Sequence, residues 1–379
     1  MIEDPAMAKM LANVKVVEMG TFITGPAAGM FLADMGADVI KVERPESGDP
    51  FRAYKGELYS PHFQTYNRNK RSIELDTRDN KDLSAFDALI KEADVFIENF
   101  RPGVADKLNV DYARLKTLNP KLIYCSISGF GSDGPDALKP AFDTVAQAAT
   151  GFLRLLLNPA NPRVVGPAIA DAITGFYASQ GILAALFKRH ETQSGCLVEV
   201  SMLEAMTHFN LDDFTHYFSS NLIMGPESRP NVSQSYVFEC QDGRWIALHM
   251  SSPAKFWTGL AEAVGKPDML DEPEFNSRDA RIENYDKVLA FLQPIFKQHP
   301  SSYWCQRLTE IEVPHSLVMN SAEALETPQA KHMKLKVHAE HPTKGNFTTV
   351  RPAIRFNGEI NDVVTAPPVL GEHNGQGFN

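Results

Sequence analysis

Short apolar runs alternate with amphipathic stretches at the start of the chain. Residues 14–19 (VKVVEM) form a β-branched apolar run, the loop GTFITGP follows, and ADVIKVER returns as a second apolar run. Between the two runs, Pro26 suits the first position of a helix and Gly36 suits the position just past its end. This order predicts a βαβ unit and therefore a parallel sheet.

The same alternation continues through the first half of the chain. A helix is predicted in DLSAFDALIKEA, and strands in ADVFIENF and KLIYCSISGFG, which gives at least four sheet strands within the first 130 residues. Residues 164–187 hold one charged side chain, Asp171, and approach the length of a membrane span. Their Gly, Ser, Thr and Gln residues are too polar for lipid, so we predict a buried helix. CLVEVSMLEAM then predicts a strand that runs into a helix.

The pattern changes in the second half. Residues 219–235 are polar and rich in turn formers, which predicts a linker. SYVFECQDGRWIALHM alternates around Asp242-Gly243 and predicts a hairpin. Amphipathic helices are predicted in PAKFWTGLAEAV, ARIENYDKVLAFLQPIFKQ and SSYWCQRLTEI, the last one capped by its serines. Residues 236–325 therefore read as a small α+β domain.

Composition narrows the functional classes. The chain has 379 residues, a length typical of two or three domains, and a formal charge of −10. It has no run of Lys and Arg, so nucleic acid is a poor partner, and no segment favours a membrane. The four cysteines form no CxxC pair, which argues against a zinc ribbon or a disulfide framework and favours a reducing cytoplasm. The N-terminus lacks the pattern of a signal peptide.

Candidate anion-binding residues cluster at predicted strand ends and loops. The glycine loop does not match GxGxxG, which argues against a dinucleotide site, but a loop before a helix N-terminus still favours an anion. Arg44 ends the second strand, where open α/β folds bind ligands, and an arginine there suits a ribose that carries a phosphate, as in coenzyme A. Further basic residues follow at Arg68, Lys70, Arg71, Arg78, Arg101 and Lys107. For any single one of them, a solvated loop charge is the favoured interpretation, and the sequence does not show whether they converge.

Asp171 is the most informative single residue. A carboxylate in an apolar segment is costly unless it is hydrogen-bonded or used in catalysis. It suits a helix N-cap, and it suits a nucleophile; the two roles are compatible, because a helix start would keep the carboxylate ionised against desolvation. The histidines show no HxxxH or HExxH spacing and there is no GxSxG elbow, so a metal site and Ser-His catalysis are not indicated.

Five ordered motifs resemble the family III CoA-transferases, typified by formyl-CoA transferase and carnitine CoA-transferase. They are GTFITGPAAGMFLADMGADVIKVERPESGDP, NRNKRSIELD, ADVFIENFRPG, FDTVAQAATG and PAIADAITGFYASQGILAAL, and the closing APPVLGEH is also similar. The resemblance implies an α/β fold with a Rossmann-like large domain of residues 1–218 and 334–379. It also implies a return linker at 326–333 after the small domain, and two chains threaded into an interlocked homodimer.

The resemblance also implies site residues and substrates. Asp171 matches the nucleophile, which attacks an acyl-CoA thioester and forms an acyl anhydride and then an aspartyl-CoA thioester; Asp143 is a supporting carboxylate. The partners would be an acyl-CoA and a small carboxylic acid, with coenzyme A as the carrier and no metal. The positions implied to contact coenzyme A are Thr24, Arg44, Leu75, Asp76, Thr77, Arg78, Asn99, Phe100, Arg101, Lys107 and Lys139.

Departures from the family pattern leave alternatives open. Ile23 stands where formyl-CoA transferase has a glutamine, and no GGGG loop occurs, so formyl-CoA and oxalate are doubtful substrates. Pro140 stands where that enzyme has a lysine that contacts CoA, and the neighbouring Lys139 would take the place of that lysine. The family includes alpha-methylacyl-CoA racemase, whose His and Glu positions are here Phe142 and Ser252. One face of the α-carbon would then lack a proton carrier, so transfer is favoured over racemisation. A non-catalytic CoA-binding protein is the third alternative.

Overall fold

The computed structural model describes residues 9–55, 57–251, 254–360 and 362–378. The chain forms two compact units, one of Met1–Leu153, Val164–Leu211 and Gln329–Asn379, the other of Arg154–Arg163 and Asp212–Pro328. The linkers at 219–235 and 326–333 stay predictions; short helices occupy parts of both stretches. Ser252, the predicted equivalent of the racemase Glu, lies outside the described residues.

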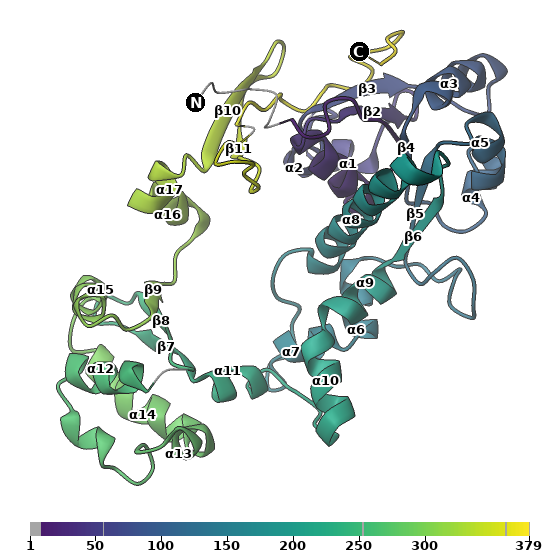
Figure 1. Cartoon of the computed structure of the whole chain (residues 1–379). Helices are drawn as coiled ribbons and strands as arrows, with labels where there is room; N and C mark the ends of the chain where they lie inside the picture. The colour runs from purple at the N-terminus through teal and green to yellow at the C-terminus, as the bar shows by residue number, and fades with distance from the viewer. Residues whose placement is uncertain (1–8, 56, 252–253, 361, 379) are drawn as a thin grey trace. The chain divides into compact units, whose positions relative to one another are not determined.

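A six-stranded parallel sheet forms the centre of the larger unit (Figure 1), which confirms the mixed α/β class. Its strand order is β3-β2-β1-β4-β5-β6. The strands are β1 (Lys15–Glu18), β2 (Asp38–Glu43), β3 (Lys70–Glu74), β4 (Val95–Glu98), β5 (Ile123–Ser128) and β6 (Leu197–Ser201). Chain order reverses between β1 and β4, and ligands bind at such a switch point, beyond the carboxyl ends of the strands.

Helices cover both faces of this sheet because its strands are apolar on both sides. Helices α1 and α8 pack on the Val16 face, and α3 and α5 pack on the Val17 face. The helices up to the small domain are α1 (Thr24–Asp34), η2 (Pro50–Tyr54), α2 (Pro61–Tyr66), α3 (Asn80–Glu92), α4 (Val104–Lys107), α5 (Tyr112–Leu118), α6 (Asp143–Ala149), α7 (Phe152–Leu156), α8 (Ile169–Thr192), α9 (Met202–Phe209), α10 (Leu211–Ser220) and α11 (Ser228–Ser233).

Strand β3 and the start of α1 differ from the sequence prediction. β3 has the sequence KRSIE, which has no apolar pattern and was not predicted as a strand. It can form a strand because ion pairs hold its polar residues: Lys70 is buried against Glu18, and Arg71 pairs with Asp38. Helix α1 begins at Thr24, two residues before the predicted start at Pro26. Gly36 follows the helix end with a φ of +99°, as predicted.

Helix α8 is only partly buried. Gly175 allows it to approach α1 closely, since a Cβ there would lie 2.7 Å from the Cβ of Ala27. The opposite face, with Phe176 and Phe187 at 54% and 74% exposure, is open in the single chain. The prediction of a buried helix is therefore correct for one face alone. Among the described residues, α8 is the one helix long and apolar enough to cross a membrane, a test that core helices of soluble proteins also pass.

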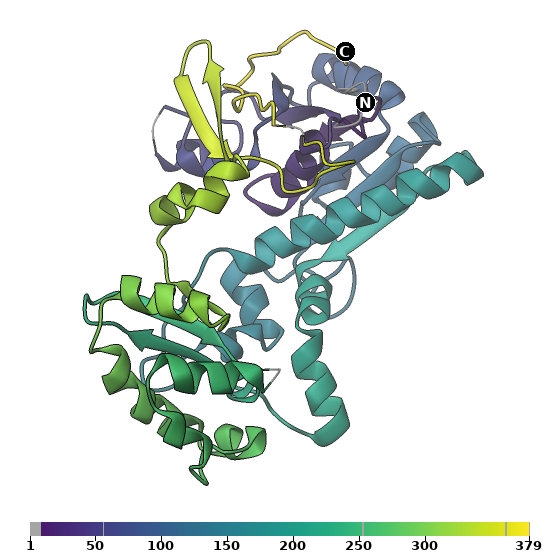
Figure 2. The same ribbon diagram turned by 60° about the vertical axis from the view of Figure 1, so that its left-hand side comes forward.

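The C-terminal residues return to the larger unit. Figure 2 shows the hairpin of β10 (Lys336–His341) and β11 (Gly345–Val350) beside the N-terminal part of the chain. We call residues 365–374 the tail. The tail lies along the free edge of β3, where the His373 N–H donates to the Ser72 carbonyl oxygen at 2.9 Å and the Glu74 N–H donates to Asn374 Oδ1 at 2.7 Å.

The smaller unit contains an antiparallel sheet of order β7-β8-β9. The hairpin predicted around Asp242-Gly243 is present, and one predicted helix is two, α13 and α14, which meet at Asn284. The elements are β7 (Ser235–Glu239), β8 (Trp245–His249), α12 (Lys255–Ala263), η3 (Pro267–Leu270), α13 (Arg278–Glu283), α14 (Tyr285–Phe296), α15 (Ser301–Glu310), β9 (His315–Leu317), α16 (Ser321–Glu326) and α17 (Pro328–His332), the last of which leads into the larger unit.

The predicted serine cap of α15 is wrong. Ser301 is already helical, and Asp242 in the hairpin turn accepts hydrogen bonds from the Ser301 N–H at 3.1 Å and from its hydroxyl at 2.8 Å. A carboxylate from a distant turn thus provides the cap.

Replacing this carboxylate should loosen the first turn of α15. We expect Asp242→Ala to destabilise the smaller unit by about 1 kcal/mol, the usual cost of losing an N-cap acceptor. Hydrogen exchange at residues 301–304 should become faster, as measured by mass spectrometry. The control is Ser301→Ala, which keeps the backbone bond to Asp242; equal exchange in both variants would contradict the assignment.

Candidate active site

Two neighbouring cavities lie in the larger unit, beyond the carboxyl ends of its strands. One, the outer cavity, has a volume of about 490 Å3 and the other, the inner cavity, about 290 Å3. Both are lined by Thr21 and Phe100, so they meet at the glycine loop (residues 20–25) and the end of β4. Arg44, at the end of β2, lines the outer cavity, and Asp171 lines the inner one.

The outer cavity has a basic rim. Arg44 lies exposed at the end of β2, and its side chain makes no ion pair within the described part of the chain. Arg78 is held by Asp76 through two side-chain hydrogen bonds of 2.8 Å. These bonds lower the pKa of Asp76 to about 2, and Arg44 adds to the shift. Two guanidinium groups at one rim suit a phosphate-bearing ligand.

The glycine loop is fixed by Asn99, which follows β4. Its Oδ1 accepts from the Thr21 N–H at 2.9 Å, and its Nδ2 donates to the Thr21 carbonyl at 2.7 Å and to Thr24 Oγ1 at 2.9 Å. Gly20 is required by close approach, because a Cβ there would lie 2.8 Å from the Cα of Gly25. The loop is therefore tight, and its shape depends on a side chain from the neighbouring strand.

Asp171 lies in the first turn of α8 and lines the inner cavity. It is the third residue of the helix. The N-cap role that the sequence left open for Asp171 is therefore wrong. Asp143 provides that cap: its Oδ1 accepts from the Ala170 N–H at 2.8 Å and from the Asp171 N–H at 3.4 Å. Gln147 donates to the other oxygen of Asp143 at 2.7 Å.

The surroundings of Asp171 favour its neutral form. Burial raises the pKa of Asp171 to about 7, and the Asp143 carboxylate adds to the shift. The sequence-based expectation that the helix start would cancel the effect of burial is therefore wrong. At neutral pH the carboxyl group is poised between its two forms, and a poorly hydrated carboxylate with a raised pKa is a strong oxygen nucleophile.

The wall of the inner cavity carries apolar side chains and two basic ones. Phe22, Phe142 and Met202 line the inner cavity, and Phe22 and Phe142 meet edge to face at 5.9 Å. Two basic residues, Arg101 and Lys139, line the same cavity, and Lys139 pairs with Asp136 at 2.7 Å. The arrangement can hold an apolar acyl group beside a carboxylate.

Comparison with known proteins decides what this arrangement belongs to. The model of CoA-transferase family III matches residues 11–374. The chain belongs to this family. It is a CoA-transferase, and its family uses CoA substrates.

Relatives of this CoA-transferase act on several acid pairs. It is 29% identical to the succinyl-CoA:glutarate CoA-transferase of Homo sapiens over 96% of this chain and 84% of that one. It is 31% identical to the formyl-CoA:oxalate CoA-transferase of Streptomyces avermitilis over 98% of this chain and 95% of that one. The crystal structure of a CAIB/BAIF family protein from Brucella suis superposes with a TM-score of 0.85 at 31% identity and covers 97% of both chains.

Most site residues predicted from the sequence of this CoA-transferase lie at the two cavities. The outer cavity is lined by Arg44, Leu75, Asp76, Thr77, Arg78 and Phe100, and the inner one by Thr24, Asn99, Phe100, Arg101, Lys139 and Asp171. Asp143 contacts the backbone of Asp171 instead. Lys107 lies exposed on α4 and lines neither cavity, although its neighbour Leu108 lines the outer one.

Sequence reasoning missed the residues beneath the glycine loop. Lys41 and Asp49 line the outer cavity, and their side chains are buried, with exposed fractions of 1% and 0%. Phe22 and Met202, in the wall of the inner cavity, were also missed. The available signal was Lys41 itself, because a lysine in the middle of an apolar parallel strand requires a buried partner.

The raised pKa of Asp171 should make stability depend on pH. The folded carboxyl holds its proton up to about pH 7, whereas an unfolded aspartate releases it near pH 4. The folded state thus binds more protons between these values, so stability should fall as pH rises through this window. Asp171→Asn removes the effect, and its Tm should exceed that of the wild type at pH 8 and approach it at pH 4.

Asp133→Asn, at an exposed loop position, serves as the control and should leave Tm unchanged at both pH values. A Tm difference for Asp171→Asn that is the same at pH 4 and pH 8 would contradict a raised pKa.

Proposed function

We propose that this protein is an acyl-CoA:carboxylate CoA-transferase in which Asp171 is the nucleophile. The observation that carries the proposal is the placement of Asp171, a partly buried carboxyl group in the inner cavity, next to a cavity with two guanidinium groups at its rim. The family membership and the names of the relatives support the reaction class.

The transfer proceeds through four exchanges at one carboxylate. An Asp171 oxygen attacks the thioester carbonyl and the C–S bond breaks. CoA thiolate departs, and an aspartyl acyl anhydride remains on the enzyme. The thiolate attacks the aspartyl carbonyl, giving an aspartyl-CoA thioester and the free donor acid. The acceptor carboxylate attacks this thioester, its C–S bond breaks, and a second anhydride and CoA thiolate are formed. The thiolate then attacks the acceptor's carbonyl carbon, which produces the new acyl-CoA and restores Asp171 with no net proton transfer.

Residues at the two cavities would hold coenzyme A along the route to Asp171. Arg44 and Arg78 suit the nucleotide phosphates, and residues 75–77 and Phe100 suit the adenine and ribose end. Asn99 and Thr24 shape the loop beside the pantetheine path, and Arg101 and Lys139 suit the thioester end. Lys107, on the surface beside the outer cavity, would contribute long-range charge.

Asp143 would act as a positioning residue. Its carboxylate holds the start of α8 through the Ala170 N–H, and its negative charge helps to raise the pKa of Asp171. It thereby fixes both the place of the nucleophile and its proton affinity.

Activity should depend on Asp171 and on its ionisation. We expect Asp171→Ala to lose activity by about a thousandfold or more, as for other covalent nucleophiles. In the wild type, kcat/KM should rise with pH to a plateau with an apparent pKa of about 7, because the ionised carboxylate attacks. The assay pairs succinyl-CoA or acetyl-CoA with a panel of carboxylates and follows CoA exchange by mass spectrometry.

Hydroxylamine or borohydride with an acyl-CoA should modify Asp171 and no other carboxylate. The matched control is Asp133→Asn, an exposed loop carboxylate that lines neither cavity, and it should keep most of the activity. Full activity of Asp171→Ala would defeat the proposal. Exchange of the α-proton of a 2-methylacyl-CoA in deuterated water without an acceptor acid would instead establish racemisation, and tight CoA binding with neither reaction would leave a binding protein.

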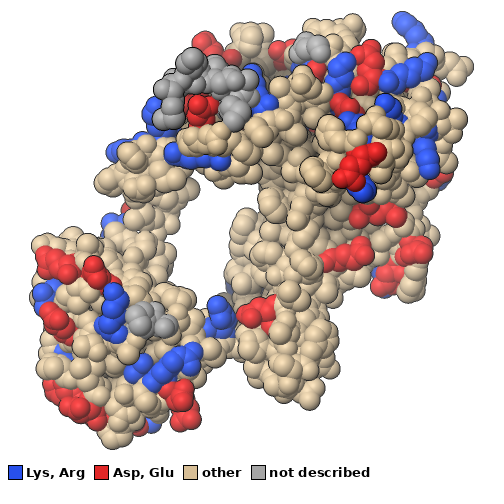
Figure 3. All heavy atoms as spheres, in the orientation of Figure 1, with Lys and Arg blue, Asp and Glu red and all other residues tan. Residues whose placement is uncertain are grey.

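We also propose that two chains assemble as an interlocked homodimer. The support is the uncovered apolar face of α8, where Phe176, Gln180, Ala184 and Phe187 form one exposed stripe at helical spacing. Figure 3 shows few charged side chains over α10, where Phe218 is 77% exposed, while charges of both signs gather over β2, β3 and α3. Large apolar side chains left uncovered on one helix face are typical of an interface.

Light scattering during gel filtration should give twice the chain mass of 42.0 kDa. Threaded chains cannot separate without unfolding, so the dimer should persist on dilution to nanomolar concentration. Phe187→Glu, which places a charge in the stripe, should reduce the dimer fraction, whereas Lys188→Ala at the adjacent polar position should not. A wild type of single-chain mass would contradict the assembly.

A further inference from the structure

The glycine loop lines both cavities in a conformation that its own sequence does not favour. Phe22 has a φ of +61°, in the left-handed region that bulky side chains rarely occupy. A residue persists there only when its surroundings hold it. Asn99 holds the neighbouring Thr21 through two hydrogen bonds, but neither of them reaches the backbone of Phe22.

Asp49 supplies the missing contact. Its Oδ1 accepts from the Phe22 N–H at 3.1 Å and from the Phe51 N–H at 2.9 Å. Its Oδ2 lies 3.1 Å from Nζ of Lys41. The side chain has no exposed surface, so these partners define its position.

Lys41 acts on the same loop from beneath. Its ammonium group donates to the Gly20 carbonyl at 2.6 Å and to Glu18 Oε1 at 2.8 Å, and it pairs with Asp49. An ammonium group has three N–H donors, and three buried partners surround this one. Two of its donors are used in hydrogen bonds, to Glu18 and to Gly20, while Asp49 Oδ2 accepts no hydrogen bond and is held by the charge of Lys41.

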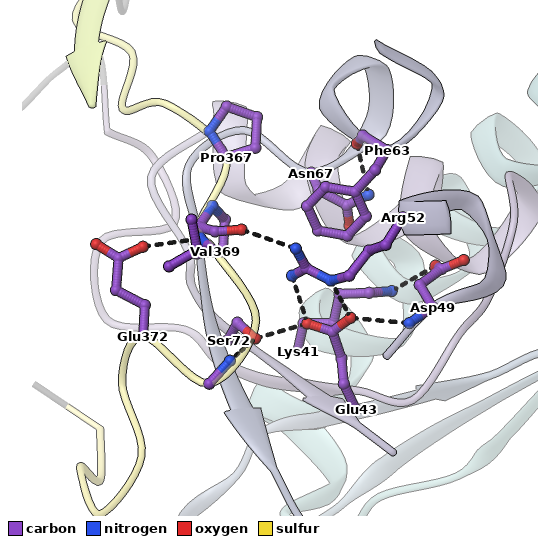
Figure 4. Close-up of polar contacts among 12 residues, drawn as sticks. Lys41, Glu43, Asp49, Arg52, Phe63, Asn67, Ser72, Pro367, Val369 and Glu372 are labelled. Atoms are coloured by element: carbon purple, nitrogen blue, oxygen red, sulfur yellow. Dashed lines mark hydrogen bonds and ion pairs between the residues drawn. The ribbon is translucent and has the colours of Figure 1, made fainter. Parts of the chain in front are cut away.

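Glu43 and Arg52 hold Asp49 in turn (Figure 4). The Asp49 N–H donates to Glu43 Oε2 at 3.0 Å, and Arg52 donates two hydrogen bonds of 2.7 Å to the Glu43 carboxylate. The Arg52 guanidinium lies 3.5 Å from the ring centroid of Phe63 and donates to the Pro368 carbonyl of the tail at 3.1 Å. A continuous set of buried contacts thus runs from the tail to the glycine loop.

We propose that Asp49 is a positioning residue for the CoA-binding loop, an inference that rests on the proposed function. Asp49 keeps Phe22 at positive φ and so holds residues 20–22 in the shape that lines both cavities. Its carboxylate is needed for two reasons: one oxygen accepts the two backbone N–H groups, and the other balances Lys41. Asp49 itself is too deeply buried to touch the substrate.

The test is Asp49→Asn, which preserves the size of the side chain. An amide has one oxygen where the carboxylate has two, so it cannot accept from Phe22 and face Lys41 at the same time. We expect the dissociation constant for coenzyme A, measured by titration calorimetry, to rise about tenfold or more. KM for the acyl-CoA should rise in step, kcat should fall less, and hydrogen exchange should accelerate at residues 20–25.

The matched control is Asp34→Asn. Asp34 is also a buried carboxylate, paired with Arg68 at 2.6 Å, but it lies at the far end of α1 and lines neither cavity. It should lower Tm to a similar extent and leave coenzyme A binding unchanged. Equal losses of affinity in both variants would show a general effect of destabilisation and overturn the positioning role.

The outcomes separate this inference from the proposed function. If the wild type binds no coenzyme A, both the proposed function and the positioning role of Asp49 are wrong. A wild type that binds and turns over, with unchanged affinity and loop exchange in folded Asp49→Asn, would overturn the positioning role alone. Should Asp49→Asn not fold, the same comparison is made with Asp49→Glu, which keeps the charge but displaces it from Phe22 by one methylene.

Discussion

A buried group of six charges supports the ligand-binding end of the sheet. It consists of Glu18, Lys41, Glu43, Asp49, Arg52 and Lys70, all with side chains at 1% exposure or less. Three acids balance three bases, so the group carries no net charge. Burial alone would raise the pKa of Glu18, but Lys41 and Lys70 outweigh it and hold that pKa below its usual value. Such groups tolerate the loss of one member poorly, because an unpaired charge stays buried.

This group also explains which strands the sequence could predict. β1 and β2 are mostly apolar, and their pattern predicted them despite Glu18 and Lys41. β3 contributes Lys70 to the group, and its sequence alone resembles a polar loop. The ionic partner of Lys70, Glu18, is 52 residues away in the sequence (70 − 18). Local periodicity carries no information about pairing across strands, so β3 became visible only in the assembled sheet.

The candidate site shows the same division. Asp171 could be located because a single carboxylate interrupts a long apolar stretch. Its raised pKa could not, because that depends first on burial in the assembled fold and then on the charge of Asp143, which caps α8 from a helix that begins 28 residues earlier (171 − 143). The glycine loop could be recognised by its composition, but the positive φ of Phe22 and the carboxylate that maintains it come from packing that composition does not specify.

The tail has a consequence for how the protein is made. β3 is an edge strand, and the residues that cover its free side are synthesised long after it, because Asn374 follows Glu74 by 300 residues. Until they emerge, the nascent sheet presents unpaired backbone groups, which are a template for association with other chains. The growing chain should therefore be most prone to association between the synthesis of β3 and that of the tail.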